Sequence, residues 1–126
     1  MKTINLLMLL TVAIFVMMGC TKKSSDSVSP SVDNVAKVIG IYSGTTTYGS
    51  YKERDTFTIT KQTSSTVLMM LTDTTQTSVN YAGVTVSDGG NGTVLLTLGT
   101  DISGVVNGKQ LDCYIQGNFH FIGYKP

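Results

Sequence analysis

The sequence contains few of the residues that hold small folds together through covalent or metal bonds. Its 126 residues include two cysteines, one histidine and no tryptophan. A structural zinc site needs about four cysteine or histidine ligands, which this chain does not offer. Cys20 has another role, described below, so Cys113 is left without a disulfide partner. The fold is therefore expected to depend on neither a disulfide nor a metal, and no cofactor is indicated.

An excess of charge of either sign is also missing. Lysine and arginine together number nine, and aspartate and glutamate number eight. Removal of Lys2 with the leader described below leaves eight of each sign. Nucleic-acid surfaces are basic, so nucleic acid is excluded as a partner.

Long apolar runs are absent except near the first residue. A positively charged start at Lys2 precedes residues 6–18, in which one threonine is the only polar residue, and Gly19-Cys20 closes the segment. This run is shorter than the roughly 20 apolar residues needed to cross a bilayer. A charged start, a short apolar stretch and a small residue at the end are typical of an export signal.

The end of this segment resembles the lipobox of bacterial lipoproteins, in which a small residue precedes an acylated cysteine. Here Gly19 precedes Cys20, and Met17 stands where the family usually has leucine. The resemblance implies that residues 1–19 are a signal peptide, that the Cys20 thiol carries lipid, and that the mature protein is anchored to a membrane of the cell envelope. The alternative is an uncleaved anchor helix with an incidental cysteine.

Residues 20–34 differ in composition from the rest of the mature chain. They contain five serines, one proline and few apolar side chains. Such a segment buries too little surface to offset the entropy of ordering, so it is predicted to be a flexible tether. The folded domain is then expected to cover residues 35–126, a length that suits one domain.

Short alternating runs fill this domain. In residues 56–60, Phe57 and Ile59 share one face and three threonines share the other, as in a strand with one side on a core. The last run places Cys113 on its apolar face and His120 on its polar face. Eight or nine segments are predicted to be strands: 38–48, 55–61, 66–72, 77–81, 83–87, 93–98, 101–106 and 109–116, with 118–124 as the ninth candidate.

Turn signals separate these segments. Asn107-Gly108 predicts a hairpin with a type I′ turn, which needs positive φ at both positions, and residues 88–92 (DGGNG) mark another reversal. No long helix is predicted; at most, Ser31 or Asp33 caps one turn at residues 35–37.

Strands in sequence order joined by tight turns predict an all-β fold, a small antiparallel up-and-down barrel of about eight strands. Closure of the sheet removes exposed edges. A sandwich with one open edge is the alternative. Nine side chains are expected to fill the interior, leaving no room for a large lipid: Phe57, Ile59, Met69, Leu71, Leu96, Leu98, Ile115, Phe119 and Phe121.

Two segments carry a resemblance to a family. Residues 38–44 (VIGIYSG) and 102–111 (ISGVVNGKQL) resemble the opening strand and the final hairpin of the β-barrel calycin-like, or lipocalin-like, domains of Gram-negative bacterial lipoproteins. Gly40, Tyr42 and Gly44 share a face, so a large ring is flanked by positions where backbone can approach closely. The resemblance implies a barrel and a cell-envelope location, where the outer membrane is the expected site of the anchor, and it supplies no catalytic residues.

Residues with catalytic potential are few. His120 is predicted to lie on the surface, Cys113 to be a packed thiol, and no Gly-x-Ser-x-Gly motif is present. Residues 52–55 (KERD) are most simply a solvated charged loop. The protein is therefore expected not to be an enzyme, with no catalytic or metal-binding residues.

Tyr48 and Tyr51 are the candidate contact residues. They flank Gly49-Ser50 in a predicted loop, where aromatic side chains either contact a ligand or protein or cap the barrel mouth. The sequence thus indicates a lipid-anchored, non-enzymatic binding or interaction module that uses loops such as 48–54 and 87–92 for an unknown small ligand or protein. The alternative is an inhibitor or immunity-type lipoprotein that blocks a hydrolase.

The assignment of Cys20 leads to a direct prediction. Replacing Cys20 with Ala should abolish labelling by a fatty-acid precursor and block removal of residues 1–19, because the thiol is the attachment point for lipid. Labelling of cells followed by electrophoresis measures both effects. A Cys20→Ala variant that still acquires label would contradict the assignment, and Cys113→Ala, which should label normally, is the matched control.

Overall fold

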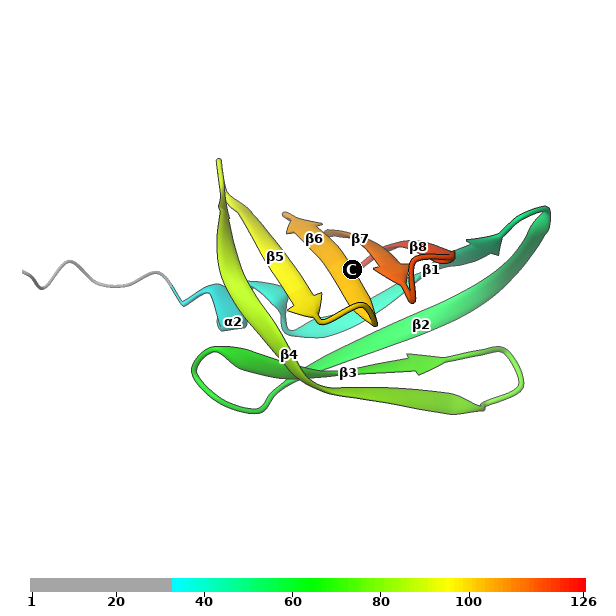
Figure 1. Cartoon of the computed structure of the whole chain (residues 1–126), viewed down its shortest axis with the longest axis horizontal. Helices are drawn as coiled ribbons and strands as arrows, with labels where there is room; N and C mark the ends of the chain where they lie inside the picture. The colour runs from blue at the N-terminus through cyan, green and yellow to red at the C-terminus, as the bar shows by residue number, and fades with distance from the viewer. Residues whose placement is uncertain (1–32) are drawn as a thin grey trace, which may run out of the picture. The chain divides into compact units, whose positions relative to one another are not determined.

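A computed structural model of the chain describes residues 33–126. In this range eight antiparallel strands follow one another in sequence order and close into a barrel, preceded by one short helix (Figure 1). The elements are α2 (Asn34–Val38), β1 (Gly40–Tyr48), β2 (Tyr51–Lys61), β3 (Thr66–Thr72), β4 (Ser78–Gly90), β5 (Thr93–Leu98), β6 (Ile102–Asn107), β7 (Gln110–Ile115) and β8 (Phe119–Tyr124). The predicted all-β, up-and-down barrel is confirmed.

The predicted signal segment 1–19, the predicted lipidation site Cys20 and the predicted tether as far as residue 32 lie outside the described residues. Within residues 33–126, no helix has the length and hydropathy that crossing a membrane requires.

Alternate side chains of the strands meet inside the barrel and form its core. Six of the nine residues predicted to point inward are buried, and Leu71 and Leu98 are partly buried against them. Phe119 is the exception because it is 37% exposed at the start of β8, beyond the last layer of the core. The rings of Phe57 and Phe121 pack edge to face in the middle of the core, 4.9 Å apart.

The fourth strand corrects one sequence prediction. Segments 77–81 and 83–87 form a single strand, β4, which continues through residue 82. Its pairing with β3 shifts there, because two residues of β4 lie opposite Leu68 alone. Gly83 adopts a φ of 74° at this bulge, and its N–H donates to the Gln62 side chain at 2.6 Å. The predicted break at residue 82 is therefore a bulge within one continuous strand.

The first hairpin, β1–β2, corrects a second sequence prediction. β2 begins at Tyr51, so residues 52–55 are paired strand residues rather than a solvated loop, and 48–54 is not a long connection. The turn consists of Gly49-Ser50 alone, with positive φ at Gly49. The four polar residues at 52–55 hide the period-two pattern, because both faces of the strand are polar at this end of the barrel.

The turn between β6 and β7 is not the type I′ turn that was predicted at residues 107–108. Asn107 pairs with Gln110, so the turn residues are Gly108-Lys109, and only Gly108 has positive φ, as in a type II′ turn. The pattern of positive φ at both turn positions occurs instead at Asn91-Gly92, between β4 and β5. The hairpin signal at 107–108 was right, but its register was wrong by one residue.

The short helix α2 covers one end of the barrel. Asp33 caps it by accepting a hydrogen bond from the Ala36 N–H at 3.1 Å, which confirms the predicted single turn. Val35 and Val38 are buried against the strands, and the Tyr42 hydroxyl donates to the Val38 carbonyl at 2.9 Å. This end of the barrel is therefore closed by packing.

Closure of the sheet depends on the pairing of β1 with β8. Gly44 lies directly opposite Gly123, and a Cβ at Gly44 would overlap the Ile122 carbonyl and the Gly123 backbone. A Cβ at Gly123 would overlap the Phe121 ring. The close approach predicted for Gly44 is thus used to close the barrel, and we call this Gly44–Gly123 contact the seam.

Substituting the seam glycine should destabilise the whole barrel. Gly44→Ala forces β1 and β8 apart and should lower the free energy of unfolding by at least about 2 kcal/mol, whereas Gly104→Ala should change it by about 1 kcal/mol or less. Gly104 is the matched control because it also lies in a strand, and a Cβ there approaches Cys113 Sγ only to 3.3 Å. Urea denaturation followed by circular dichroism measures both, and equal losses would contradict the role of the seam.

Candidate functional site

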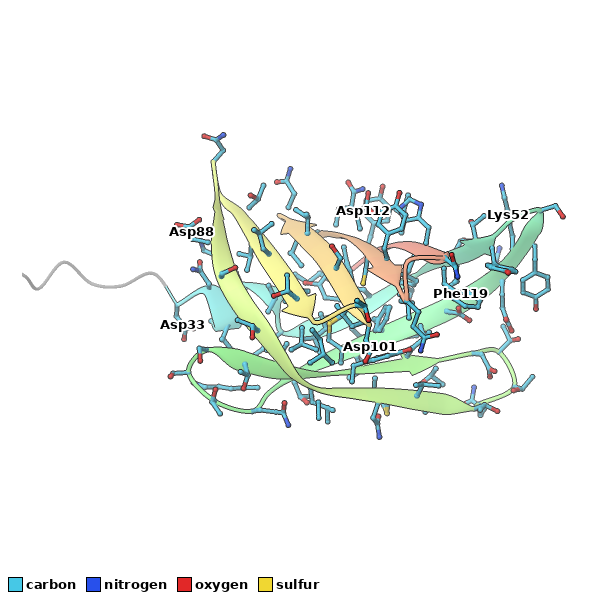
Figure 2. All side chains as sticks on the ribbon, viewed as in Figure 1. Asp33, Lys52, Asp88, Asp101, Asp112 and Phe119 are labelled. Atoms are coloured by element: carbon cyan, nitrogen blue, oxygen red, sulfur yellow. The ribbon has the colours of Figure 1, made fainter. Side chains whose placement is uncertain are left out.

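The turns fall alternately at the two ends of the barrel because each strand runs antiparallel to its neighbours. The end opposite α2 is here called the open end. Four turns gather there: residues 49–50, 73–77, 99–101 and 116–118. In Figure 2, Asp33 and Asp88 lie toward the α2 end, and Lys52 and Phe119 lie toward the open end.

A pocket of about 220 Å³ enters the barrel at the open end. Its lining combines aromatic, aliphatic and acidic side chains from three of the four hairpins. The lining residues are Thr46, Tyr48, Tyr51, Glu53, Asp55, Leu71, Asp73, Thr77, Val79, Tyr81, Ile115, Gln116 and Phe119.

Two polar side chains are buried where this pocket meets the core. Asp55 and Thr46 are each only 7% exposed, and both point inward from neighbouring strands. The Asp55 Oδ1 and Thr46 Oγ1 atoms have no hydrogen-bond partner among the described residues. A buried acceptor without a donor costs about 1–3 kcal/mol, so these atoms would gain from any donor that enters the pocket.

The surroundings of Asp55 shift its pKa upward from that of an exposed aspartate. Burial raises the pKa of this carboxyl, and the nearby Glu53 and Asp73 carboxylates raise it further. The Thr46 hydroxyl lies close enough to lower the pKa of Asp55 in part, but the two side chains do not reach hydrogen-bonding geometry. Asp55 is thus a buried acid held in an unfavourable environment, which is a common property of functional sites.

Two further carboxylates stand at the rim of the pocket and are held in place. Glu53 accepts hydrogen bonds from the Tyr51 hydroxyl at 3.1 Å and from the Thr74 hydroxyl at 3.2 Å, which joins the first hairpin to the turn at 73–77. Asp73 accepts from the Thr75 hydroxyl and from the backbone of that turn, and these bonds lower its pKa. Asp73 therefore carries a fixed negative charge at the pocket mouth.

The aromatic side chains of the pocket include both residues singled out from the sequence. Tyr48 stacks on Phe119 with ring centroids 4.8 Å apart, and Tyr51 is 61% exposed beside them. Tyr81 is half-buried on the far wall. The structure thus brings Tyr48 and Tyr51 together at one pocket, where they are both contact surface and part of the rim.

The other loop singled out from the sequence lies elsewhere. Residues 87–92 belong to the β4–β5 hairpin, at the α2 end of the barrel (Figure 1). Loops 48–54 and 87–92 are therefore at opposite ends and do not form one binding surface.

A wider depression on the outside of the barrel has a different character. It measures about 800 Å³ and crosses the outer faces of β1, β2 and β3. Five of its twelve lining residues are threonines, and those on its floor are exposed or half-exposed; Arg54, Asp55 and Asp73 also line it. Exposed hydroxyls are satisfied by water, so this open face gives less reason to expect a ligand than the pocket at the open end does.

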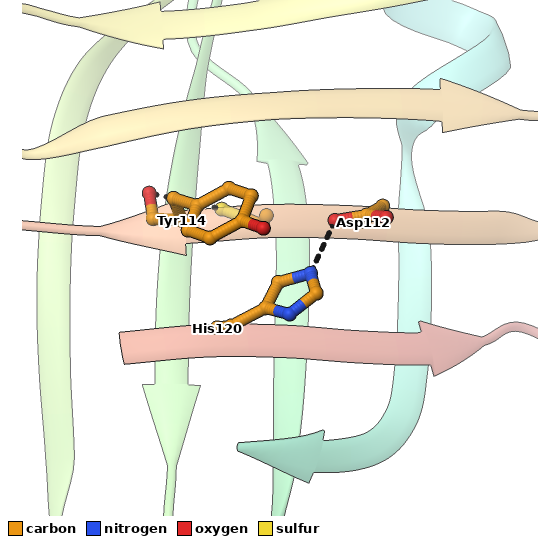
Figure 3. A network of polar contacts seen from close by, with 4 residues as sticks. Asp112, Tyr114 and His120 are labelled. Atoms are coloured by element: carbon orange, nitrogen blue, oxygen red, sulfur yellow. Dashed lines mark hydrogen bonds and ion pairs between the residues drawn. The ribbon is translucent and has the colours of Figure 1, made fainter. Parts of the chain in front are cut away.

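The histidine and the cysteine of the domain are separated from the pocket. His120 lies on the outer face, where its Nε2 is 2.7 Å from Asp112 Oδ1 and its ring stacks flat on Tyr114 (Figure 3). Cys113 faces the core with no exposed surface, and burial raises its pKa to about 12. Such a thiol is not a ready nucleophile. Both residues lie on the faces predicted from the alternation of β7 and β8.

The pocket offers acceptors and negative charge, and its lining contains no lysine, arginine or histidine. No three histidine, cysteine, aspartate or glutamate side chains within residues 33–126 are arranged to hold a metal ion. The sequence prediction missed Asp55, Thr46 and Phe119 as site residues. A signal was available for Asp55, which shares the parity of the buried Phe57 and Ile59.

Comparison with known proteins supplies no relative: no family model, no curated protein and no solved structure matches this chain.

The raised pKa of Asp55 predicts a pH-dependent loss of stability. A carboxyl whose pKa is higher in the folded than in the unfolded chain binds more protons when folded, so stability falls as the pH rises from the usual 3.8 through the raised value. Asp55→Asn removes the titrating carboxyl. The free energy of unfolding of this variant, minus that of the wild type, should therefore increase as the pH rises from 3.8 through the raised pKa.

Urea denaturation of the wild type and the variant at a series of pH values measures the difference between them. Asp101→Asn, at an exposed aspartate of the 99–101 turn, is the control for the loss of one carboxyl group by itself. A difference between Asp55→Asn and wild type that stays constant with pH would contradict the assigned environment of Asp55.

Proposed function

We propose that this protein is a lipid-anchored, non-enzymatic binding module of the bacterial cell envelope, held to the outer membrane through Cys20, and that it binds a small ligand in the pocket at the open end. The observation that carries the proposal is the pair of buried acceptors, Asp55 Oδ1 and Thr46 Oγ1, left without donors where the pocket meets the core. Natural proteins rarely leave buried acceptors unsatisfied, and a ligand donor would satisfy them.

The size of the pocket limits the ligand. At about 220 Å³ it is smaller than the 300–1,000 Å³ typical of sites for drug-sized ligands. Below it the interior is filled by buried side chains such as Phe57, Met69 and Phe121. These features support a small ligand bound at the barrel mouth and argue against a carrier of fatty acids or larger lipids.

The anchor and the envelope location rest on the sequence. The lipobox-like Gly19-Cys20 and the serine-rich segment 20–34 are what a lipoprotein tether requires. An eight-stranded antiparallel barrel is compatible with the calycin-like domains that the chain resembles. A tethered barrel would meet ligands or partners close to the membrane surface.

The inhibitor alternative predicts a different geometry. A protein that blocks a hydrolase would present a rigid, protruding loop with an anchor residue for the partner's active site. The first turn at the open end has only two residues, and the exposed Tyr51 that follows it is hydrogen-bonded to Glu53 within the same hairpin. A lined pocket with unsatisfied acceptors favours ligand binding.

A fragment screen tests the proposed function without assuming the ligand class. The full chain, in a non-ionic detergent, is titrated with neutral, anionic and cationic fragments of fewer than about ten heavy atoms, while nuclear magnetic resonance follows the aromatic rings. We expect saturable shifts at Tyr48, Tyr81 and Phe119, because these rings line the pocket.

A pair of matched variants locates the binding. Val79→Trp adds bulk at an exposed valine of the pocket lining and should abolish the shifts, whereas Val105→Trp, at an exposed valine outside that lining, should leave them unchanged. If no fragment shifts the pocket rings, or if the shifts survive Val79→Trp, binding at the open end is ruled out.

A further inference from the structure

We infer that the ligand of the open-end pocket is a small organic cation with N–H donors, a primary ammonium or a guanidinium group on an apolar or aromatic body. This inference rests on the proposed function and names the chemistry that the same pocket recognises. Four features of the pocket support it: the buried acceptors, the negative charge of the lining, the aromatic rings and the spacing of the acidic groups.

The buried acceptors of the pocket favour a ligand that donates hydrogen bonds. Asp55 and Thr46 are more than nine-tenths buried, line the pocket and leave Oδ1 and Oγ1 without partners. An ionised carboxylate has no proton to donate, so its preferred partner is an N–H or O–H group, and a charged N–H group is preferred most. The threonine hydroxyl can accept a second bond from the same group.

The negative charge of the pocket lining favours a positively charged ligand. Glu53, Asp55 and Asp73 all face the pocket, and hydrogen bonds from the 73–77 turn keep Asp73 ionised. Lys52 and Arg54 alternate to the outer face of β2, where Arg54 shares a depression with Asp55 and Asp73, but neither basic residue shifts the pKa of Asp55 or of Asp73. A cation that enters the pocket relieves repulsion among the three carboxylates and stabilises the ionised form of Asp55.

The rings give the cation and its body a favourable environment. Tyr48 and Phe119 form a stacked wall, and Tyr51 and Tyr81 complete the aromatic part of the lining. The faces of aromatic rings attract ammonium and guanidinium groups. Leu71, Val79 and Ile115 supply apolar contact for the part of the ligand that carries no charge.

The spacing of the acidic groups argues for an organic cation rather than a metal ion. Within residues 33–126, no three acidic, histidine or cysteine side chains converge as a metal site requires. A divalent ion needs about six oxygen ligands within roughly 2.6 Å. Carboxylates spread around a pocket of about 220 Å³ fit a molecule of several heavy atoms better than a single ion.

Three benzyl probes separate the contributions of charge and donors. Benzylammonium has both, benzyltrimethylammonium has charge without N–H donors, and benzyl alcohol is neutral. Affinities are measured by calorimetry with the full chain in a non-ionic detergent at pH 7. Benzylammonium should bind about tenfold or more tightly than either of the others, as expected for a charged hydrogen bond formed in a buried site.

Matched variants assign this preference to the buried acceptors. Asp55→Asn should weaken benzylammonium binding about tenfold or more and leave benzyl alcohol unchanged, and Thr46→Val should weaken it less. Asp112→Asn makes the same change of charge on the outer face and should have no effect. Melting temperatures establish that each variant is folded, and Thr46→Val provides a second test that keeps the carboxylate.

The outcomes distinguish this inference from the proposed function. Equal affinity for the three probes, no binding of benzylammonium, or undiminished binding by Asp55→Asn would each overturn the cation inference. The fragment screen decides the proposed function by itself, because neutral or anionic fragments that shift the pocket rings would preserve the pocket as a binding site.

Discussion

The closure of the sheet at the seam is the constraint on which the rest of this structure depends. Gly44 and Gly123 allow β1 and β8 to approach closely enough to pair, and the Phe121 ring packs beside them. Closure turns one face of the sheet into an interior and divides the turns between two ends. The helix α2 covers one of these ends. At the other end, polar residues of the strands line the mouth of the barrel. The pocket is therefore a consequence of how the barrel closes.

The polar end of the barrel is costly for folding and suited to binding. Inward-facing positions of β2 change along the strand from Ile59 and Phe57 in the core to Asp55 and Glu53 at the mouth. A carboxyl buried without a donor weakens the fold, and such groups are retained in proteins mainly where they act on a ligand. Glu53 is held by Tyr51 and the 73–77 turn, so the charges around the pocket are positioned before any ligand arrives. Preorganised charges of this kind reduce the cost of binding.

The sequence predicted the barrel because period-two alternation is strong wherever one face is apolar. It failed where that contrast is lost: residues 52–55 are polar on both faces, so a paired strand looked like a loop. The fourth strand was divided at residue 82 because the sequence does not distinguish a bulge from a turn. Phe119 follows the apolar parity of β8 but lies beyond the core. For the site, Tyr48 and Tyr51 were found from the aromatic pair beside a turn. Thr46 was missed because its burial depends on the closure of the barrel, which brings distant turns together.

The state of the Asp55 carboxyl is the most direct test of this pocket as a binding site for organic cations. Its pKa can be measured in the full chain from the ¹³C shift of the carboxyl carbon as a function of pH, with and without benzylammonium. The expected result is a pKa above 3.8 in the free protein that falls when benzylammonium is bound, because a cation favours the ionised form. A pKa at or below 3.8 in the free protein, or one that does not change with benzylammonium, would contradict the proposal.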